Sequence, residues 1–175
     1  GKTFLVDTLL AWLRSNGHIV LVFAPTGIAA TIYEHGQTVH SLFCIPVKDD
    51  HIGILSEIRI PSGWADLIHA ASLIVFDEMP GANKTTGEAI DMVCHHIMSC
   101  DIPFGGLPFL GLGDFRQLVP VVKGTGETAA LQASILSSPL WPMFKIHHLH
   151  APVRNRDDPE FSAFVDYIGE DTSGE

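Results

Sequence analysis

The sequence contains little of what disulfide-stabilised, zinc-binding or membrane-spanning proteins need. Among 175 residues there are three cysteines, Cys44, Cys94 and Cys100, an odd number without the spacing of zinc ligands. Free thiols in a reducing compartment such as the cytosol or nucleus are therefore expected. No apolar run reaches the ~18 residues of a membrane helix, and no charged-then-apolar leader opens the chain, so no membrane partner is expected. Because the first residue is Gly1 and not Met, the natural start is expected upstream.

Basic residues are scarce as well. Ten Lys and Arg stand against 20 Asp and Glu, which gives a formal net charge of −10 at pH 7. Phosphate contacts rest on Lys and Arg, so this balance argues against tight nucleic-acid binding by the chain alone. Seven of the acids lie between Asp157 and Glu175, where no basic residue occurs, and without them the net charge is about −3. The charge therefore does not exclude DNA binding by a longer protein.

What the sequence has in quantity is apolar residues and histidines. With 46% apolar and 17% charged residues, the chain is typical of one globular domain. Its ten histidines include His147, His148 and His150, in and beside an expected strand over residues 145–149. Neighbouring strand residues point to opposite faces, so a half-exposed strand is favoured here over a metal site.

Expected strands and helices alternate, which predicts an α/β fold with a mainly parallel sheet flanked by helices. Helices are expected over residues 2–15, 65–71 and 86–98, with a short one after Gly27 and a looser stretch from 36 to 63. Strands are expected over residues 19–24, 73–76, 107–112 and 145–149. A last helix is expected to begin at an Asp158 cap, with four inward-facing residues: Phe161, Phe164, Val165 and Ile168.

Three of the expected strands end in polar residues, and ligands of open α/β sheets bind at the carboxyl ends of strands. The chain itself opens with Gly1-Lys2-Thr3 running directly into a helix. This tripeptide is the end of a G-x-x-x-x-G-K-[ST] phosphate-binding loop, in which Lys2 would reach the β- and γ-phosphates and the Thr3 hydroxyl would hold Mg²⁺. The tripeptide alone is common by chance.

A second polar segment strengthens the interpretation. The apolar strand 73–76 runs into Asp77-Glu78, where an Asp is expected to hold Mg²⁺ and a Glu to polarise the attacking water. The alternative is a solvated strand end. Gly113-Asp114-Phe115-Arg116-Gln117 follows another strand, and Gln117 is placed to reach the γ-phosphate, although the segment is equally typical of an ordinary turn.

Longer segments carry a resemblance to a known family. They are Ala24-Pro25-Thr26-Gly27-Ile28-Ala29-Ala30, Gly36 to Phe43, Leu73 to Pro80, Pro103-Phe104-Gly105-Gly106 with Gly113 to Val122, and Ser137 to Trp141 with Val153 to Phe161. In this order they resemble motifs Ia, II and III and the segment leading through motif IV of Pif1-like DNA helicases, closest to the eukaryotic, Helitron-type branch. Gly81, where the family often has Met, and Asn155, where Gln is frequent, depart from the pattern without removing a catalytic group.

The resemblance implies roles for single residues. Gly1, Lys2, Thr3 and Asp77 would bind ATP and Mg²⁺, Glu78 and Gln117 would serve catalysis, and Arg154 would be an arginine finger. A surface salt bridge with Asp157 or Asp158 is the alternative for Arg154. The resemblance also places six residues along the path of single-stranded DNA: Thr26, Gly27, Thr38, His40, Ser41 and Phe43. For Phe43, stacking on a base and burial in the core are equally plausible.

The resemblance further implies a RecA-like P-loop NTPase domain, with residues 1–175 forming a partial first motor domain that lacks its first strand and the second motor domain. The full-length protein is then expected to be an ATP-dependent, 5′-to-3′ DNA helicase of repair, recombination and telomere maintenance. It would act as a monomer on single strands and duplex junctions in the nucleus or mitochondrion. Two alternatives stay open: another class of P-loop NTPase, and a decayed, transposon-derived remnant without activity.

Overall fold

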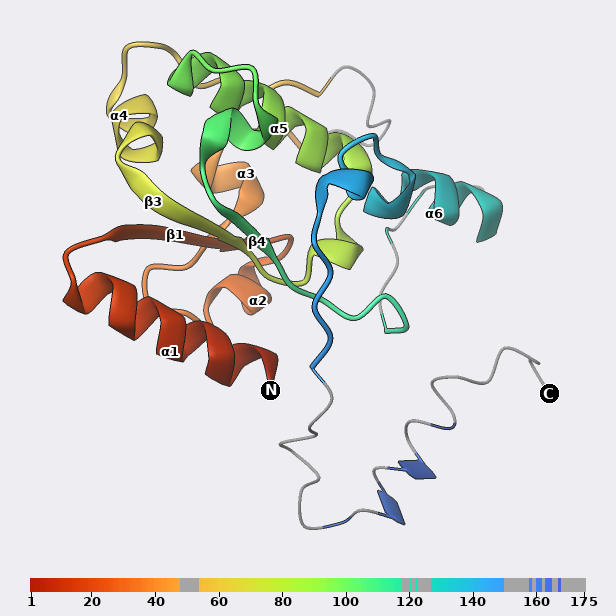
Figure 1. Cartoon of the computed structure of the whole chain (residues 1–175). Helices are drawn as coiled ribbons and strands as arrows, with labels where there is room; N and C mark the ends of the chain where they lie inside the picture. The colour runs from red at the N-terminus through yellow and green to blue at the C-terminus, as the bar shows by residue number, and fades with distance from the viewer. Residues whose placement is uncertain are drawn as a thin grey trace.

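A four-stranded parallel sheet forms the centre of the molecule (Figure 1). The computed structural model describes residues 1–47, 54–117, 120, 122, 127–149, 158, 160, 161, 163, 164 and 167. The strands, in the spatial order β2-β1-β3-β4, are β1 (Ile19–Ala24), β2 (Gln37–Thr38), β3 (Ala71–Phe76) and β4 (Phe109–Gly111). Every pairing between neighbours is parallel. The expected α/β fold with a parallel sheet is confirmed.

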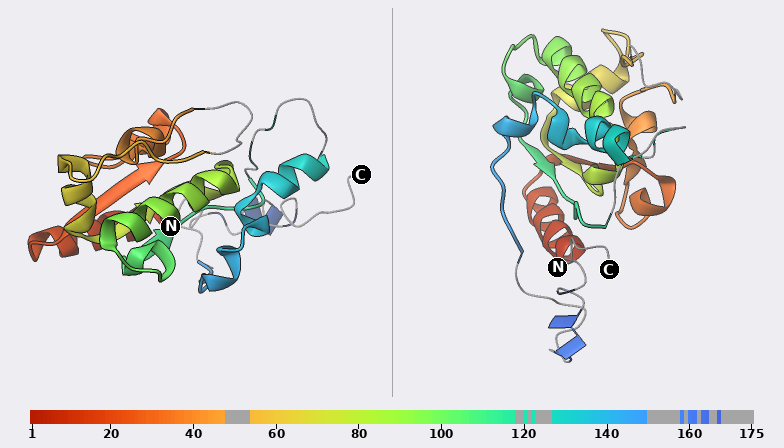
Figure 2. Two further views of the ribbon diagram at one scale, coloured as in Figure 1. Left: turned by 90° about the horizontal axis from the view of Figure 1, so that it is seen from above. Right: turned by 90° about the vertical axis from the view of Figure 1, so that its right-hand side faces the viewer.

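Helices cover both faces of this sheet. Figure 1 shows α1 (Lys2–Ser15) and α2 (Gly27–Ala30) on one side, and α3 (Val39–Leu42), α4 (Gly63–His69) and α5 (Lys84–Met98) on the other. Figure 2 shows α1 and α5 on opposite sides of the strands in a second view. The remaining elements are α6 (Glu127–Ala133) and four 3₁₀ turns, η1 (Met79–Gly81), η2 (Pro103–Gly106), η3 (Ile135–Ser137) and η4 (Trp141–Met143).

The apolar run of β1 is explained by burial on both faces. Leu21 and Phe23 face the α4–α5 side, where Phe23 packs edge-on against Phe43 with ring centroids 5.0 Å apart. Val20 and Val22 belong to a second cluster beneath α1. The sequence of a strand that is covered on both faces is a continuous hydrophobic run, because successive side chains point alternately into the two apolar layers. Each fully buried side chain of this size contributes about 1.5–3 kcal/mol to stability.

Helix ends follow the expected chemistry. Asn16 is the C-cap of α1, and Gly17, the next residue, has a left-handed φ of +79°. At the start of α4, the Ser62 hydroxyl accepts a hydrogen bond from the Ala65 N–H. The Asn83 side chain caps α5 by accepting from the Thr85 N–H at 3.1 Å. Such caps satisfy backbone groups that have no partner inside the helix. Helix α5 buries the expected apolar face: Ile90, Val93, Cys94 and Ile97.

Two expectations near the C-terminal end are wrong. Residues 145–149 form no strand and are exposed, including Ile146 and Leu149 at 55% each. They pair with none of the four strands of the described sheet, and an extended segment becomes a strand only through such pairing. The Asp158 cap is confirmed, since its carboxylate accepts the Phe161 N–H at 2.9 Å. However, Phe161 and Phe164 are 49% and 58% exposed, not inward-facing. Val165 and Ile168 lie outside the described residues.

Among the described residues, no helix is long and apolar enough to cross a membrane.

Candidate active site

The carboxyl ends of β1, β3 and β4 meet at one edge of the sheet, and backbone hydrogen bonds continue beyond the strands. The Asp77 N–H donates to the Phe23 carbonyl at 2.9 Å, and the Leu112 N–H donates to the Phe76 carbonyl at 2.8 Å. The Met79 N–H then donates to the Leu112 carbonyl at 2.9 Å. The polar residues that follow β3 are therefore fixed by both neighbouring strands.

The first helix brings the N-terminal tripeptide to this edge. Gly1 is the N-cap of α1, and its carbonyl accepts the Leu5 N–H at 3.1 Å. Lys2 Nζ lies 3.3 Å from Glu78 Oε1, an ion pair between side chains that are 29% and 33% exposed. Residues 76 positions apart in sequence thus meet in space. The pair joins the helix N-terminus, which attracts anions, to the turn after β3.

Glu78 has an unusual backbone. Its φ of +51° and ψ of +35° are left-handed, a conformation that costs a non-glycine residue about 1 kcal/mol or more. Pro80, two residues on, packs against Gly113, where an added Cβ would lie 2.0 Å from Pro80 Cδ. The turn after β3 and the turn after β4 are therefore in van der Waals contact, and this contact needs glycine.

Asp77 is the most enclosed charged group of the site, at 4% exposure. Its Oδ1 accepts the Glu78 N–H at 3.0 Å, and its Oδ2 accepts the Tyr33 hydroxyl at 2.8 Å. Burial, and then the hydrogen bond to Asp77, raise the pKa of Tyr33 well above its usual range, so the phenol is a donor at every physiological pH. A hydrogen bond with the Thr3 side chain has a smaller, opposite effect on this pKa.

These oxygens fit a magnesium ion. The Asp77 carboxylate takes part in no ion pair within the described residues, although a buried carboxylate is costly without a compensating cation. Mg²⁺ prefers hard oxygen ligands and is commonly held by one or two protein groups together with water and phosphate oxygens. The Thr3 hydroxyl, next to Lys2, and the Asp77 carboxylate, next to Glu78, are such a pair, because the ion pair between Lys2 and Glu78 joins these two segments.

The turn after β4 supplies a second carboxylate. Burial acts to raise the pKa of Asp114, but hydrogen bonds and the charge of Arg116, together with the charge of Lys2, lower it below its ordinary value of 3.8. Arg116 Nε lies 3.2 Å from Asp114 Oδ1. Gln117 is exposed, and its N–H donates to the Asp114 carbonyl at 3.1 Å.

Five of the six residues expected along a DNA path lie in two turns: Thr26 and Gly27 follow β1, while Thr38, the last residue of β2, leads into the α3 turn with His40 and Ser41. The Thr26 hydroxyl accepts the Ala29 N–H, and the Thr38 hydroxyl accepts the Ser41 N–H, each capping a short helix. Gly27 and Ser41 are exposed. His40 Nδ1 donates to the Ile45 carbonyl at 2.9 Å, which fixes its tautomer. Both turns therefore present backbone and hydroxyl groups at the edge of the sheet.

For the sixth residue, Phe43, the expected stacking on a DNA base is wrong. Its side chain has 0% exposure and packs against Phe23 in the core on the α4–α5 side. A ring without accessible surface has no face on which a base can stack, so burial, the other of the two expectations, describes Phe43.

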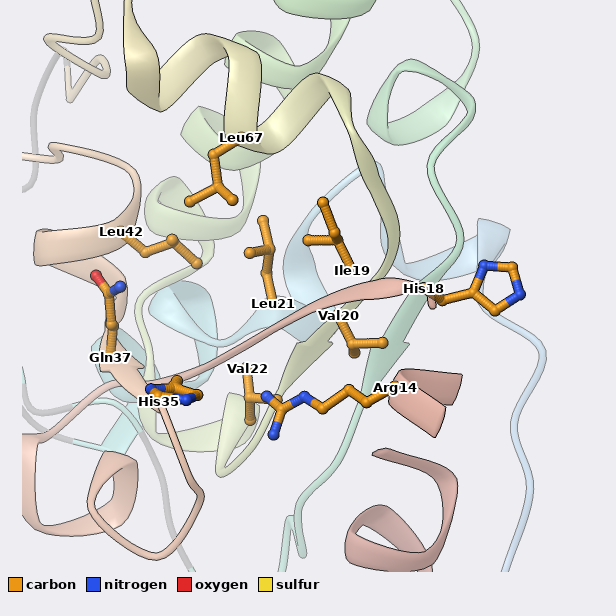
Figure 3. Close-up of a pocket in the computed structure, with 10 residues that line it drawn as sticks. All are labelled: Arg14, His18, Ile19, Val20, Leu21, Val22, His35, Gln37, Leu42 and Leu67. Atoms are coloured by element: carbon orange, nitrogen blue, oxygen red, sulfur yellow. The ribbon is translucent and has the colours of Figure 1, made fainter. Parts of the chain in front are cut away.

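Two cavities differ in position. One of about 210 Å³ is lined by Thr26, His40 and Asn83, among other residues, and lies between the two turns and the start of α5. The other, of about 270 Å³, follows the edge of β1, with Leu21, Leu42 and Leu67 on its apolar side (Figure 3). Residues expected to bind ligands line the first cavity only.

Some predicted residues lie outside the described part of the chain. Arg154 and His150 are among them, and so are Asp157 and most of the C-terminal acidic segment. The described histidines of the 147–150 cluster, His147 and His148, are exposed.

Tyr33 is a residue of the site that the sequence analysis did not predict. Nothing in the sequence Thr31-Ile32-Tyr33-Glu34 distinguishes its tyrosine from an ordinary surface aromatic.

Comparison with known proteins identifies the family. The model of the PIF1-like helicase family matches residues 1–173. The ATP-dependent DNA helicase Pif1 of Psychrobacter sp. (strain PRwf-1) is 31% identical over 69% of this chain and 18% of its own length. The human ATP-dependent DNA helicase PIF1 is 27% identical over 71% of this chain and 19% of its own length. The chain thus spans about a fifth of these relatives.

Solved structures agree in fold. Pif1 from Bacteroides sp. in complex with ADP-AlF4 superposes with a TM-score of 0.73 at 27% identity, covering 96% of this chain and 39% of that one. Pif1 from Candida albicans gives a TM-score of 0.74 at 21% identity, covering 97% and 38%, a likeness in fold. With one family model matching nearly every residue and the same sheet in solved relatives, this chain belongs to the PIF1-like helicase family.

Proposed function

We propose that the protein containing this chain is an ATP-dependent DNA helicase, and that residues 1–175 form a large part of its first RecA-like motor domain. The observation that carries the proposal is the convergence of Lys2 and Thr3 from α1 with Asp77 and Glu78 from the end of β3. A helix N-terminus, a lysine and a pair of carboxylates at one sheet edge are what binding and hydrolysis of a nucleoside triphosphate require.

Each residue has a separate task in this proposal. Gly1 and Lys2 bind the phosphates at the start of α1, while Thr3 and Asp77 hold Mg²⁺, which supplies positive charge beside the phosphate oxygens. Glu78 orients the attacking water and accepts its proton, and Gln117 contacts the γ-phosphate. The ion pair between Lys2 and Glu78 has to open for this, since both side chains then face the ligand. Arg154 stabilises the transferring phosphoryl group as an arginine finger.

Single-stranded DNA and duplex junctions are the proposed partners. Bacteroides Pif1 has been solved bound to single-stranded DNA, and a further relative at forked double-stranded DNA. In this chain, Thr26, Gly27, Thr38, His40 and Ser41 offer hydroxyl and backbone groups that suit phosphate contacts. Such contacts position a strand, whereas tight binding rests mainly on Lys and Arg, so it is proposed for the longer protein and not for this chain with its net charge of −10. Translocation in the 5′-to-3′ direction completes the proposal.

We also propose a cellular role for the protein. Human PIF1 and yeast RRM3 are both ATP-dependent DNA helicases similar to this chain. Repair, recombination and telomere maintenance are the proposed processes, in the nucleus or mitochondrion, with the protein acting as a monomer.

The test is ATP hydrolysis by the full-length protein with and without single-stranded DNA, beside its Glu78→Gln variant and an assay of strand separation. We expect strong DNA stimulation that the variant loses, together with unwinding of a tailed duplex. Hydrolysis without strand separation would point to another class of P-loop NTPase. A folded full-length protein without any hydrolysis would favour the decayed-remnant alternative.

A further inference from the structure

Tyr33 lies between α2 and β2 in sequence, packs beneath α1 and contacts Asp77 at the end of β3. It follows α2 in sequence, between the proposed DNA-side turn and β2, and its side chain is 4% exposed. The ring packs in the apolar cluster beneath α1 with Val6, Leu10 and Leu112. Its hydroxyl, however, leaves this apolar layer and reaches Asp77. A ring that served packing alone would need no hydroxyl at this position, because burying a phenol oxygen requires a partner.

The two hydrogen bonds on Asp77 define the direction of its carboxylate. The Tyr33 hydroxyl donates to Oδ2 at 2.8 Å, and the Glu78 N–H donates to Oδ1 at 3.0 Å. One donor on each oxygen prevents rotation of the group about its terminal torsion, while each oxygen keeps a second lone pair. The Tyr33 hydroxyl therefore fixes one oxygen of the carboxylate that is proposed to hold the metal ion.

We propose that Tyr33 is a positioning residue for the magnesium site: its hydroxyl orients the Asp77 carboxylate. This inference rests on the proposed function. Outer-shell partners of this kind typically change metal affinity 10- to 100-fold when removed. Because Asp77 takes part in no ion pair within the described residues, its orientation depends on these two neutral donors.

The variant Tyr33→Phe removes one oxygen and keeps the ring that packs beneath α1. In the full-length protein, a fluorescent ADP analogue would be bound at fixed concentration and titrated with MgCl₂, and its affinity would also be measured in EDTA. We expect the half-saturating Mg²⁺ concentration to rise about tenfold or more, while the affinity for the Mg²⁺-free analogue stays within about twofold. A role in packing alone would not produce this difference between the two affinities.

Tyr167→Phe is the matched control, because it removes the same atom from the other tyrosine of the chain, which is 71% exposed. It should leave both affinities unchanged. Equal Mg²⁺ requirements in wild type and Tyr33→Phe would overturn the inference and leave the helicase proposal standing. A parallel loss of Mg²⁺-free binding would also overturn it, since Tyr33 would then support the fold in general. If the wild type itself bound no nucleotide, the proposed function would fail, and this inference with it.

Discussion

At the scale of single residues, the candidate site compensates most of its charges internally. Lys2 is paired with Glu78, and Arg116 with Asp114, while Asp77 is held by neutral donors. The Glu78 carboxylate occupies one of the three donors of the Lys2 ammonium group and offsets its charge, so it competes with phosphate for Lys2. In the proposed function, a bound nucleotide would replace Glu78 as the partner of Lys2 and leave Glu78 free to contact water.

This exchange predicts that Glu78→Gln separates binding from chemistry. Turnover should fall by about 10²–10⁴, the usual contribution of a general base. Nucleotide affinity should be retained or rise, because Lys2 no longer has a carboxylate partner 3.3 Å away. Steady-state hydrolysis and equilibrium nucleotide binding of the full-length protein measure the two effects. Glu34→Gln, which changes a carboxylate that is 79% exposed, is the control. A marked loss of affinity in Glu78→Gln would contradict the exchange.

Asp114 gives a prediction on pH. Its pKa is lowered in the folded protein, so its ionised form contributes stability above the ordinary value of 3.8, and this contribution is lost as the pH falls through the lowered pKa. Removing the guanidinium in Arg116→Gln should raise this pKa. The difference in free energy of unfolding between wild type and variant should therefore be largest at neutral pH and shrink in acid. Urea unfolding over a pH series measures it, and a difference that grew in acid would contradict the assignment.

Sequence and structure diverge most clearly in aromatic residues of the site. Lys2, Thr3, Asp77 and Glu78 were predictable because each belongs to a motif whose spacing relative to a strand or helix has a chemical reason. Tyr33 was not, since its contact with Asp77 depends on how the segment after α2 folds back over 44 positions of sequence.

At the scale of elements, the site depends on the contact between two turns. Gly113 packs directly on Pro80, and a methyl group there would overlap with the proline ring. Gly113→Ala should thus force apart the turns that carry Glu78 and Gln117. We expect a loss of about 1–3 kcal/mol in stability, as for other overpacked sites, together with weaker nucleotide binding.

Gly63→Ala is the control for this variant. Gly63 begins α4, and an added Cβ would meet nothing within 4 Å, so the change should be neutral or slightly stabilising. Chemical unfolding of both variants makes the comparison. Equal stabilities of Gly113→Ala and Gly63→Ala would show that the two turns move independently.

Elements were predictable where their hydrophobic pattern was long. The sequence locates β1, α1 and α5 to within two residues at each end, because a continuous apolar run of six residues determines β1 and helical periodicity over 14 and 15 residues determines α1 and α5. The two-residue β2 and the four-residue α3 are too short to show a period, and α6 was not expected either. The strand expected over 145–149 failed for a different reason: a pattern can predict an extended segment but cannot supply the neighbour with which it pairs.

At the scale of the whole molecule, the described groups form one side of a nucleotide site. Only the last three residues of the eight-residue phosphate-loop pattern are present at the start of this chain, and Arg154 lies outside the described part. The chain matches 39% of the Bacteroides Pif1 structure that was solved with ADP-AlF4. Most backbone N–H donors of a phosphate loop precede its lysine, so few of them remain to hold the β-phosphate in this chain.

The 175-residue chain by itself is accordingly expected to hydrolyse ATP at least about 10³-fold more slowly than the full-length protein, with no stimulation by single-stranded DNA. Removing one preorganised N–H donor from a site of developing charge costs about 10²–10³ in rate, and this chain retains few of the donors of a phosphate loop. Hydrolysis by both proteins at equal concentration, after circular dichroism has verified that each is folded, measures the ratio. Comparable turnover by chain and full-length protein would mean that residues 1–175 suffice for catalysis. The proposed arginine finger is tested separately: in the full-length protein, Arg154→Ala should lower turnover by about 10³ or more, whereas Arg156→Ala, two positions away, should not.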